Sequence, residues 1–207
     1  MKLNTFSICA RCEKTNQIGI AIATAVPKVR YLCPYIAPGV GAVVTQSYHS
    51  KILGTESLKL LNMGIHPEII IKKVLSNDKE MDYRQLGIVD IHGNTAAWTG
   101  RKCSPQSFHL VCDNVSVQGN LLKDKNTISA MFKKFQSSKN YNLTERLMLA
   151  LEEGSKTGGD KRGGKKQSAN LIVYSESVLP LINVSIDKSE NPVAELRKTL
   201  NKKLAIN

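Results

Sequence analysis

A glycine- and lysine-rich segment, 155–167, carries a dense group of residues that could do chemistry. Two glycine pairs, Gly158-Gly159 and Gly163-Gly164, permit positive φ angles that bring backbone N–H groups close to an anion. The segment has one acidic residue, Asp160, and five basic residues, which are Lys156, Lys161, Arg162, Lys165 and Lys166. The segment is therefore either a solvated charged loop or part of a site for an anionic substrate, and both interpretations stay open.

The same segment matches a phosphate-binding loop only in part. The residues from Gly159 to Lys165 fit the pattern up to its lysine, but Lys166 follows where a Ser or Thr would bind magnesium. The predicted order of elements is also reversed, because a helix precedes the segment and a strand follows it. A phosphate loop leaves a strand and enters a helix, whose N-terminus meets the phosphate. The sequence therefore argues against a nucleotide site here.

Cysteines and histidines give little sign of a metal site. Cys9 and Cys12 have C-x-x-C spacing, but residues three apart in a strand point to opposite faces. The histidines are scattered and lack the i, i+4 spacing of a zinc-binding helix. The five cysteines are an odd number, which suits reduced thiols better than a disulfide framework. We expect buried structural thiols, no metal and no cofactor.

Composition limits the classes of protein to consider. The 207 residues include 29 Lys+Arg and 17 Asp+Glu, a formal net charge of +12, which allows nucleic acid, an acidic membrane surface or an anionic small molecule as partner. Only 5% of the residues are aromatic and no nucleic-acid-binding motif is present, so nucleic acid is disfavoured. The sequence shows neither a signal peptide nor an apolar run long enough to span a membrane. We expect a cytoplasmic protein with no membrane association.

These residues must be positioned by alternating blocks of strands and amphipathic helices. Hairpins are predicted at 4–12 with 17–25, and at 84–91 with 95–99, and a proline-punctuated loop at 27–38. Further strands are predicted at 39–45, 108–117, 169–174 and 181–186. The spacing of apolar residues and the capping residues predict helices over 55–63, from 66 through 74, over 128–135, over 142–154 and over 191–204.

This order of elements predicts an α+β fold. Helices arrive in pairs between blocks of antiparallel hairpins, which is not the pattern of a βαβ repeat. Two packed, mainly antiparallel sheets with helices on their outer faces fit better, as a four-layer α/β/β/α sandwich. No internal repeat and no long linker divides the chain, so we expect residues 1–207 to form a single domain.

Several stretches resemble the bacterial and archaeal family known as domain of unknown function 1028. They follow the family's order along nearly the whole chain, and they are 5–11 (TFSICAR), 39–46 (GVGAVVTQ), 85–90 (QLGIVD), 117–122 (VQGNLL), 158–163 (GGDKRG), 167–169 (QSA) and 192–197 (PVAELR). The family is placed in the N-terminal nucleophile (Ntn) hydrolase superfamily. The resemblance therefore implies the four-layer sandwich that the element order predicts independently.

The resemblance also implies an amide hydrolase. In that superfamily a Thr, Ser or Cys at the mature N-terminus attacks an amide carbonyl, and its own α-amine serves as the base. A free α-amine has an ordinary pKa of about 7.7–8.0, close enough to neutrality to accept a proton. Thr5 would be the nucleophile in this chain. Because Thr5 is preceded by four residues, activity would require cleavage of the Asn4–Thr5 bond, through attack by the Thr5 hydroxyl on the preceding carbonyl.

The remaining site residues follow from the same resemblance. Lys161 or Arg162 would lower the pKa of the Thr5 amine if the segment folds over it, with Asp160 orienting the lysine. Asn120 would donate to the oxyanion, with Gln118 as the second candidate. The residues expected to contact a small, acidic amide substrate are Gln46, Gln118, Arg162, Gln167 and Ser168.

Two other functions stay open. Because fold does not fix function, a catalytically silent, ligand-binding protein of the same fold is one alternative. Such a protein would keep its first four residues. A nucleic-acid binder is suggested by the net charge alone. We also expect a homodimer, since folds of this kind often bury apolar faces in assemblies.

Overall fold

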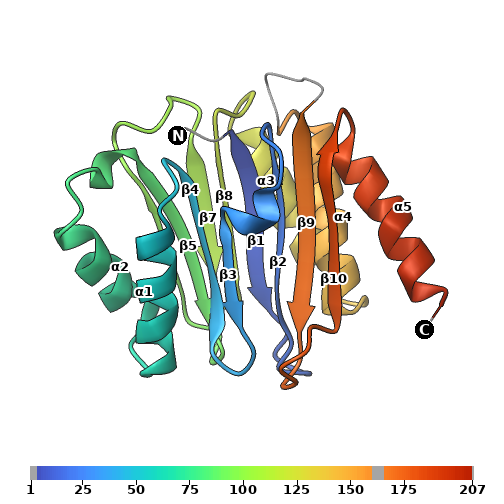
Figure 1. The fold of residues 1–207 in the computed structure, drawn as a ribbon, viewed down its shortest axis with the longest axis horizontal. Helices are drawn as coiled ribbons and strands as arrows, with labels where there is room; N and C mark the ends of the chain where they lie inside the picture. The colour runs from blue at the N-terminus through green and yellow to red at the C-terminus, as the bar shows by residue number, and fades with distance from the viewer. Residues whose placement is uncertain (1–3, 160–165, 207) are drawn as a thin grey trace.

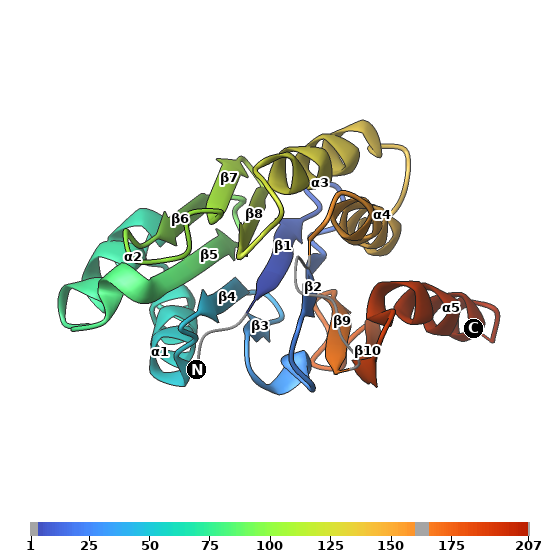
Figure 2. The same ribbon diagram turned by 90° about the horizontal axis from the view of Figure 1, so that it is seen from above.

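Two antiparallel sheets lie face to face with helices on their outer sides, in a computed structural model that describes residues 4–159 and 166–206 (Figures 1 and 2). The larger sheet has six strands in the order β10 (Ile182–Ser189), β9 (Gln167–Tyr174), β2 (Ile18–Thr24), β1 (Thr5–Arg11), β8 (Val115–Asn120) and β7 (Phe108–Cys112). The smaller has four, in the order β3 (Pro34–Ala37), β4 (Gly41–Ser47), β5 (Arg84–Asp90) and β6 (Thr95–Thr99).

The helices cover the two outer faces. α1 (Lys51–Asn62) and α2 (Pro67–Ser76) pack on the four-stranded sheet, whereas α3 (Asn126–Ser137), α4 (Leu143–Lys156) and α5 (Pro192–Leu204) cover the six-stranded sheet (Figure 2). Short 3-10 turns, Val29–Tyr31 and Met81–Tyr83, precede β3 and β5. The four-layer α/β/β/α sandwich predicted from the sequence is thus confirmed.

Strand alternation divides the apolar residues of β1 between two cores. Phe6, Ile8 and Ala10 pack against α3 and α4 in one cluster. Cys9, from the other face of β1, packs between the sheets with residues of β2, β4 and β5. Because successive side chains of a strand point to opposite faces, Thr5 and Ser7 lie on the same face as Cys9 and look toward the second sheet.

Two of the predicted elements were wrong. The strand predicted at 108–117 is a hairpin, because Asn114 has a φ of 67° and turns the chain between β7 and β8; asparagine tolerates this left-handed conformation. The proline-punctuated loop contains the edge strand β3, which Pro34 begins at a position where no ladder donor is needed.

One helix end was also misplaced. The helix predicted at 142–154 begins as expected, with the Asn142 side chain accepting a hydrogen bond from the Glu145 N–H at 2.9 Å. It does not end at Gly154 but continues to Lys156. A Cβ at Gly154 would lie 2.7 Å from the Met131 sulfur and 3.0 Å from the Phe6 ring. The glycine therefore serves close packing of α4 rather than helix termination.

No helix within residues 4–159 or 166–206 combines the length and apolar character needed to cross a bilayer.

Candidate functional site

Four polar residues lie side by side across one end of the six-stranded sheet. In the strand register Thr5 of β1 is opposite Asn120 of β8 on one side and Thr24 of β2 on the other, and Thr24 is opposite Ser168 of β9. We call these residues the polar row. All four side chains are at most 1% exposed. The fold thus collects polar groups from four strands at the position of the predicted nucleophile.

The Thr5 hydroxyl belongs to a short hydrogen-bonded chain. Thr5 Oγ1 lies 3.0 Å from Thr24 Oγ1, and Thr24 Oγ1 donates to the Asn4 carbonyl oxygen at 2.6 Å. A hydroxyl has one proton, so Thr5 must be the donor to Thr24. The Ala25 N–H also donates to the Asn4 carbonyl oxygen, at 3.0 Å. The carbonyl that precedes Thr5 is therefore held by two donors, as in an oxyanion hole.

Asn120, the predicted oxyanion donor, is held from the second sheet by Gln85. The Asn120 Nδ2 donates to Gln85 Oε1 at 3.1 Å, and the Gln46 Nε2 donates to the same oxygen at 2.8 Å. Gln85 Nε2 in turn lies 3.0 Å from the Gly119 carbonyl oxygen and 2.9 Å from Thr99 Oγ1. Gln85 is fully buried and joins both sheets beside the polar row.

Two further predicted residues, Gln46 and Gln118, meet at Ser7. The Gln118 Nε2 donates to Ser7 Oγ at 2.7 Å, and Ser7 Oγ donates to Gln46 Oε1 at 2.8 Å. A Cβ on Gly87 would lie 2.1 Å from Gln118 Oε1, so only glycine leaves room for this amide. Both glutamine side chains are fully buried between the sheets, where their amides bind protein groups.

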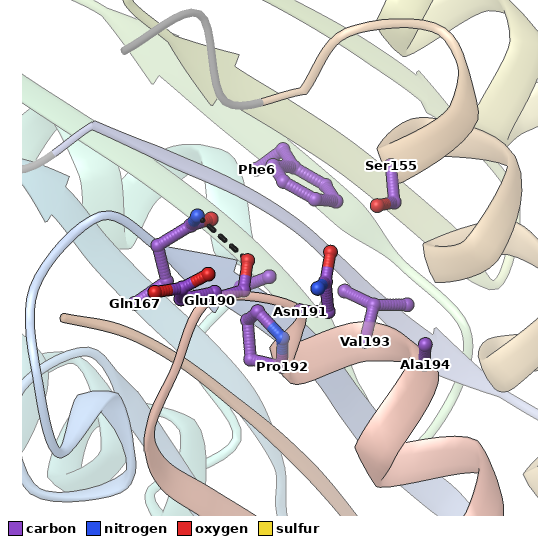
Figure 3. A pocket seen from close by; sticks show the side chains of 9 residues that line it. Phe6, Ser155, Gln167, Glu190, Asn191, Pro192, Val193 and Ala194 are labelled. Carbon is purple, nitrogen blue, oxygen red and sulfur yellow. Dashed lines mark hydrogen bonds between the residues drawn. The ribbon is translucent and has the colours of Figure 1, made fainter. Parts of the chain in front are cut away.

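Ser168 and Gln167, at the start of β9, have different surroundings. Ser168 Oγ donates to the Val26 carbonyl at 2.6 Å and accepts from the Val29 N–H at 3.0 Å, which fixes the chain after β2. Gln167 Nε2 donates to the Glu190 carbonyl at 3.1 Å (Figure 3). Gln167 lines a cavity of about 190 Å³ with Phe6, which belongs to the helix-side face of β1. That cavity therefore lies on the opposite face of the sheet from the Thr5 hydroxyl.

Asp160, Lys161 and Arg162 lie outside the described residues. The described residues on either side of them are at the Thr5 end of the sheet. A Cβ at Gly159 would lie 2.5 Å from the Phe6 ring, and Ser168 belongs to the polar row. Gly159 is thus beside β1, and Ser168 lies at the same end of the sheet on β9, from which β1 is separated by β2.

Cysteine chemistry does not enter this site. Burial raises the pKa of the Cys9 thiol to about 12, although a hydrogen bond with Gln118 opposes the shift. Burial also raises the pKa of Cys33. Among the residues that the structure describes, no three of His, Cys, Asp and Glu gather closely enough to hold a metal ion. Cys9 and Cys33 are therefore protonated packing residues at neutral pH.

Sequence reasoning missed Thr24 and Gln85 as members of the site. Thr24 carries no motif of its own, and only the β1–β2 register brings it beside Thr5. Gln85 begins the stretch 85–90, which did carry the family resemblance, but its partners are on other strands. A polar residue in an otherwise apolar buried strand was the only local signal.

Comparisons with known proteins agree with this architecture. Residues 5–196 match the family model described as "Family of unknown function (DUF1028)". The crystal structure of a DUF1028 protein from Silicibacter pomeroyi is 30% identical, with a TM-score of 0.87, and the match covers 96% of this chain and 88% of that chain. No curated protein matches the chain.

Structures of Anbu, the ancestral beta-subunit, also match the chain, with low TM-scores. The Anbu of Yersinia bercovieri is 13% identical with a TM-score of 0.44, over 97% of this chain and 94% of that chain. The Anbu of Hyphomicrobium sp. strain MC1 is 10% identical with a TM-score of 0.45, over 97% of this chain and 95% of that chain.

Proposed function

The chain belongs to the DUF1028 family of unknown function, and on that premise we propose that it is an amide hydrolase of the N-terminal nucleophile type. Thr5 becomes the nucleophile once the Asn4–Thr5 bond is cleaved. The observation that carries this proposal is the pair of hydrogen bonds from Thr24 Oγ1 and the Ala25 N–H to the Asn4 carbonyl oxygen. The family match also begins at Thr5, so the four residues before it are not part of the matched segment.

The activation step uses groups that the hydrogen bonds through Thr24 already connect. Thr5 Oγ attacks the Asn4 carbonyl carbon, and negative charge develops on the oxygen that Thr24 and Ala25 hold. The C–N bond to Thr5 then breaks as the hydroxyl proton, which points toward Thr24, passes to the Thr5 nitrogen. The product is an ester between Asn4 and the Thr5 side chain. Water hydrolyses that ester to an Asn4 carboxylate, and Thr5 keeps its hydroxyl and gains a free α-amine.

The substrate reaction uses the same end of the sheet. The Thr5 α-amine removes the hydroxyl proton as Oγ attacks a small amide, with a pKa near neutrality suited to that task. Asn120 donates to the developing oxyanion, and Gln85 orients its amide. We assign Asp160, Lys161 and Arg162 to the recognition of an anionic substrate and to the pKa of the amine. The amides of Gln46 and Gln118 and the Ser168 hydroxyl position neighbouring groups, since each already binds protein atoms.

Intact mass and N-terminal sequencing of the purified full chain test this proposal. We expect the four residues before Thr5 to be lost from the wild type and kept in Thr5→Ala, with slow loss in Thr5→Ser, which retains a hydroxyl. A wild-type chain that keeps residues 1–4 through prolonged incubation at pH 7–8 would overturn self-activation.

A catalytically silent, ligand-binding protein is the second candidate, and one observation favours it. Thr5 is 0% exposed and Asn4 is 1% exposed, so a substrate reaches the hydroxyl only after the preceding residues have left. This alternative expects an intact N-terminus and ligand binding that Thr5→Ala does not change.

A further inference from the structure

A cavity of about 550 Å³ opens beside the end of β1 that is opposite to Thr5. Its walls come from the chain after β1, the β7–β8 turn and the connection between α3 and α4. β1 runs from Thr5 to Arg11, six steps of ~3.3 Å, so the cavity is about 20 Å from the Thr5 site. Its volume is in the range of small-molecule sites. The proposed amide hydrolysis gives this cavity no role.

Two arginines of this cavity differ from the other arginines that the structure describes. The structure describes six arginines. Four of them form ion pairs with carboxylates, and these four are Arg30, Arg84, Arg101 and Arg197. Arg11 and Arg146 form no such pair within the described residues, and both line the cavity. The two described arginines without an acidic partner thus line the same cavity.

Neutral groups orient both guanidinium groups. Arg11 donates to the side-chain oxygens of Asn114 and Asn16, at 3.0 and 2.8 Å. The Arg146 guanidinium lies 3.9 Å from the centre of the Phe135 ring and donates to the Phe135 carbonyl at 3.4 Å. In each arginine the Nε is buried without a hydrogen-bond partner among the described residues. Positive charge that is partly removed from water and uncompensated is costly, and an anion would compensate it.

The charged residues that line the cavity have a positive excess, which comes from the two arginines. The exposed Lys14 and Lys139 are balanced by the exposed acids Glu13 and Asp113. Cys12 also lines it. Partial burial disfavours the Cys12 thiolate, but hydrogen bonds from Thr15 and Lys14, with the Arg146 charge, outweigh this and lower the pKa of Cys12. Burial lowers the pKa of Arg146, although the interaction with Cys12 opposes the shift.

We propose that Arg11 and Arg146 together bind the carboxylate or phosphate of a small organic anion in this cavity. The planar guanidinium group presents a fork of N–H donors that matches both oxyanions, and such charge-assisted hydrogen bonds are strong. The ring of Tyr141, which is 59% exposed and also lines the cavity, contacts the body of the ligand.

Titration calorimetry on the full chain tests the site with four probes. These are inorganic phosphate, phenyl phosphate, benzoate and, as the neutral counterpart, benzyl alcohol. We expect phenyl phosphate or benzoate to bind and benzyl alcohol not to bind. The tighter of the two anions identifies the head group, and weaker binding of inorganic phosphate than of phenyl phosphate supports the ring contact. Failure of both organic anions to bind at millimolar concentrations would overturn the proposal.

Matched variants locate the binding. Arg11→Gln and Arg146→Gln should each weaken binding of the preferred anion at least tenfold, whereas Arg101→Gln, at an exposed arginine of another surface, should not change it. Unchanged affinity in both cavity variants contradicts the assignment. Because Arg146→Gln also loses its ring contact and could unfold, alkylation of the wild type provides a second readout. The preferred anion should slow alkylation of Cys12 several-fold and leave Cys103 unaffected, and equal rates with and without the anion contradict the proposal.

Discussion

The Thr24 hydroxyl lies 2.6 Å from the Asn4 carbonyl oxygen and donates to it. The same hydroxyl accepts the proton of Thr5, so one side chain connects the attacking group to the oxygen of the bond it would attack. This relationship exists because β1 and β2 pair with Thr5 opposite Thr24. A shift of one residue in that register would turn the Thr24 hydroxyl to the helix side of the sheet.

Replacing Thr24 should slow self-cleavage. Thr24→Val keeps the shape but removes the donor to the Asn4 carbonyl, and loss of one oxyanion donor costs about 10²–10³ in rate. Thr24→Ser keeps the hydroxyl and should cleave within about tenfold of the wild-type rate. A time course of intact mass measures both. Equal rates in Thr24→Val and the wild type would show that this hydrogen bond plays no part in cleavage.

Gln85 should be coupled energetically to Asn120. Gln85→Leu removes the buried oxygen that accepts from the Asn120 amide, and removing one partner of a buried hydrogen bond costs about 1–3 kcal/mol. Urea unfolding of Gln85→Leu, Asn120→Leu and the double variant gives the coupling. We expect the double variant to be more stable than the sum of the single effects predicts, by at least about 0.5 kcal/mol. Strict additivity would mean that the two amides do not act together.

Gly87 should tolerate no side chain while Gln118 is present. Gly87→Ala places a methyl group against the Gln118 amide, and overpacking of this kind costs about 1–3 kcal/mol. Shortening the neighbour should relieve the conflict, so Gly87→Ala should lower the free energy of unfolding less in a Gln118→Ala background. Denaturant unfolding measures the loss of stability caused by Gly87→Ala in each of the two backgrounds. An equal cost in both backgrounds would place the strain elsewhere.

Asp78 should contribute a pH-dependent part of the stability. Its burial alone would raise the pKa of the carboxyl, but hydrogen bonds from Arg84 and the Glu80 N–H, with the Arg84 charge, lower it overall. A pKa below the unfolded value of about 3.9 stabilises the folded state above that pH, and the contribution is lost as the pH falls through the folded pKa.

The Asp78→Asn variant checks the sign of this effect. It should be less stable than the wild type at pH 7, and the difference should shrink as the pH falls below about 4. Asp113→Asn, at an exposed acid, serves as the control, and its stability should depend on pH as that of the wild type does. Thermal unfolding over pH 2–7 measures the effect, and a difference that grows on acidification would reverse the proposed sign.

Sequence patterns were sufficient for most of the fold because their signals are local. The hairpin of β1 and β2, the α3 stripe and the Asn142 cap each arise from residues close in the chain. The errors fell where local signals were ambiguous. The β7–β8 turn depends on one asparagine in a left-handed conformation, and Gly154 resembles a helix stop although it serves packing.

The sequence by itself determined the α+β class, through the order of its predicted elements, and the family, through stretches spread along the chain. The resemblance to that family is what makes Thr5 the candidate nucleophile. Only the tertiary structure decided which groups surround Thr5 and which arginines lack acidic partners. Thr24, Asn120, Gln85 and Gln46 come together through strand pairing and sheet packing between segments distant in the chain. The same holds for Arg11 and Arg146, which are 135 residues apart in number yet line one cavity. Such neighbours are set by register and burial, and no local pattern encodes them.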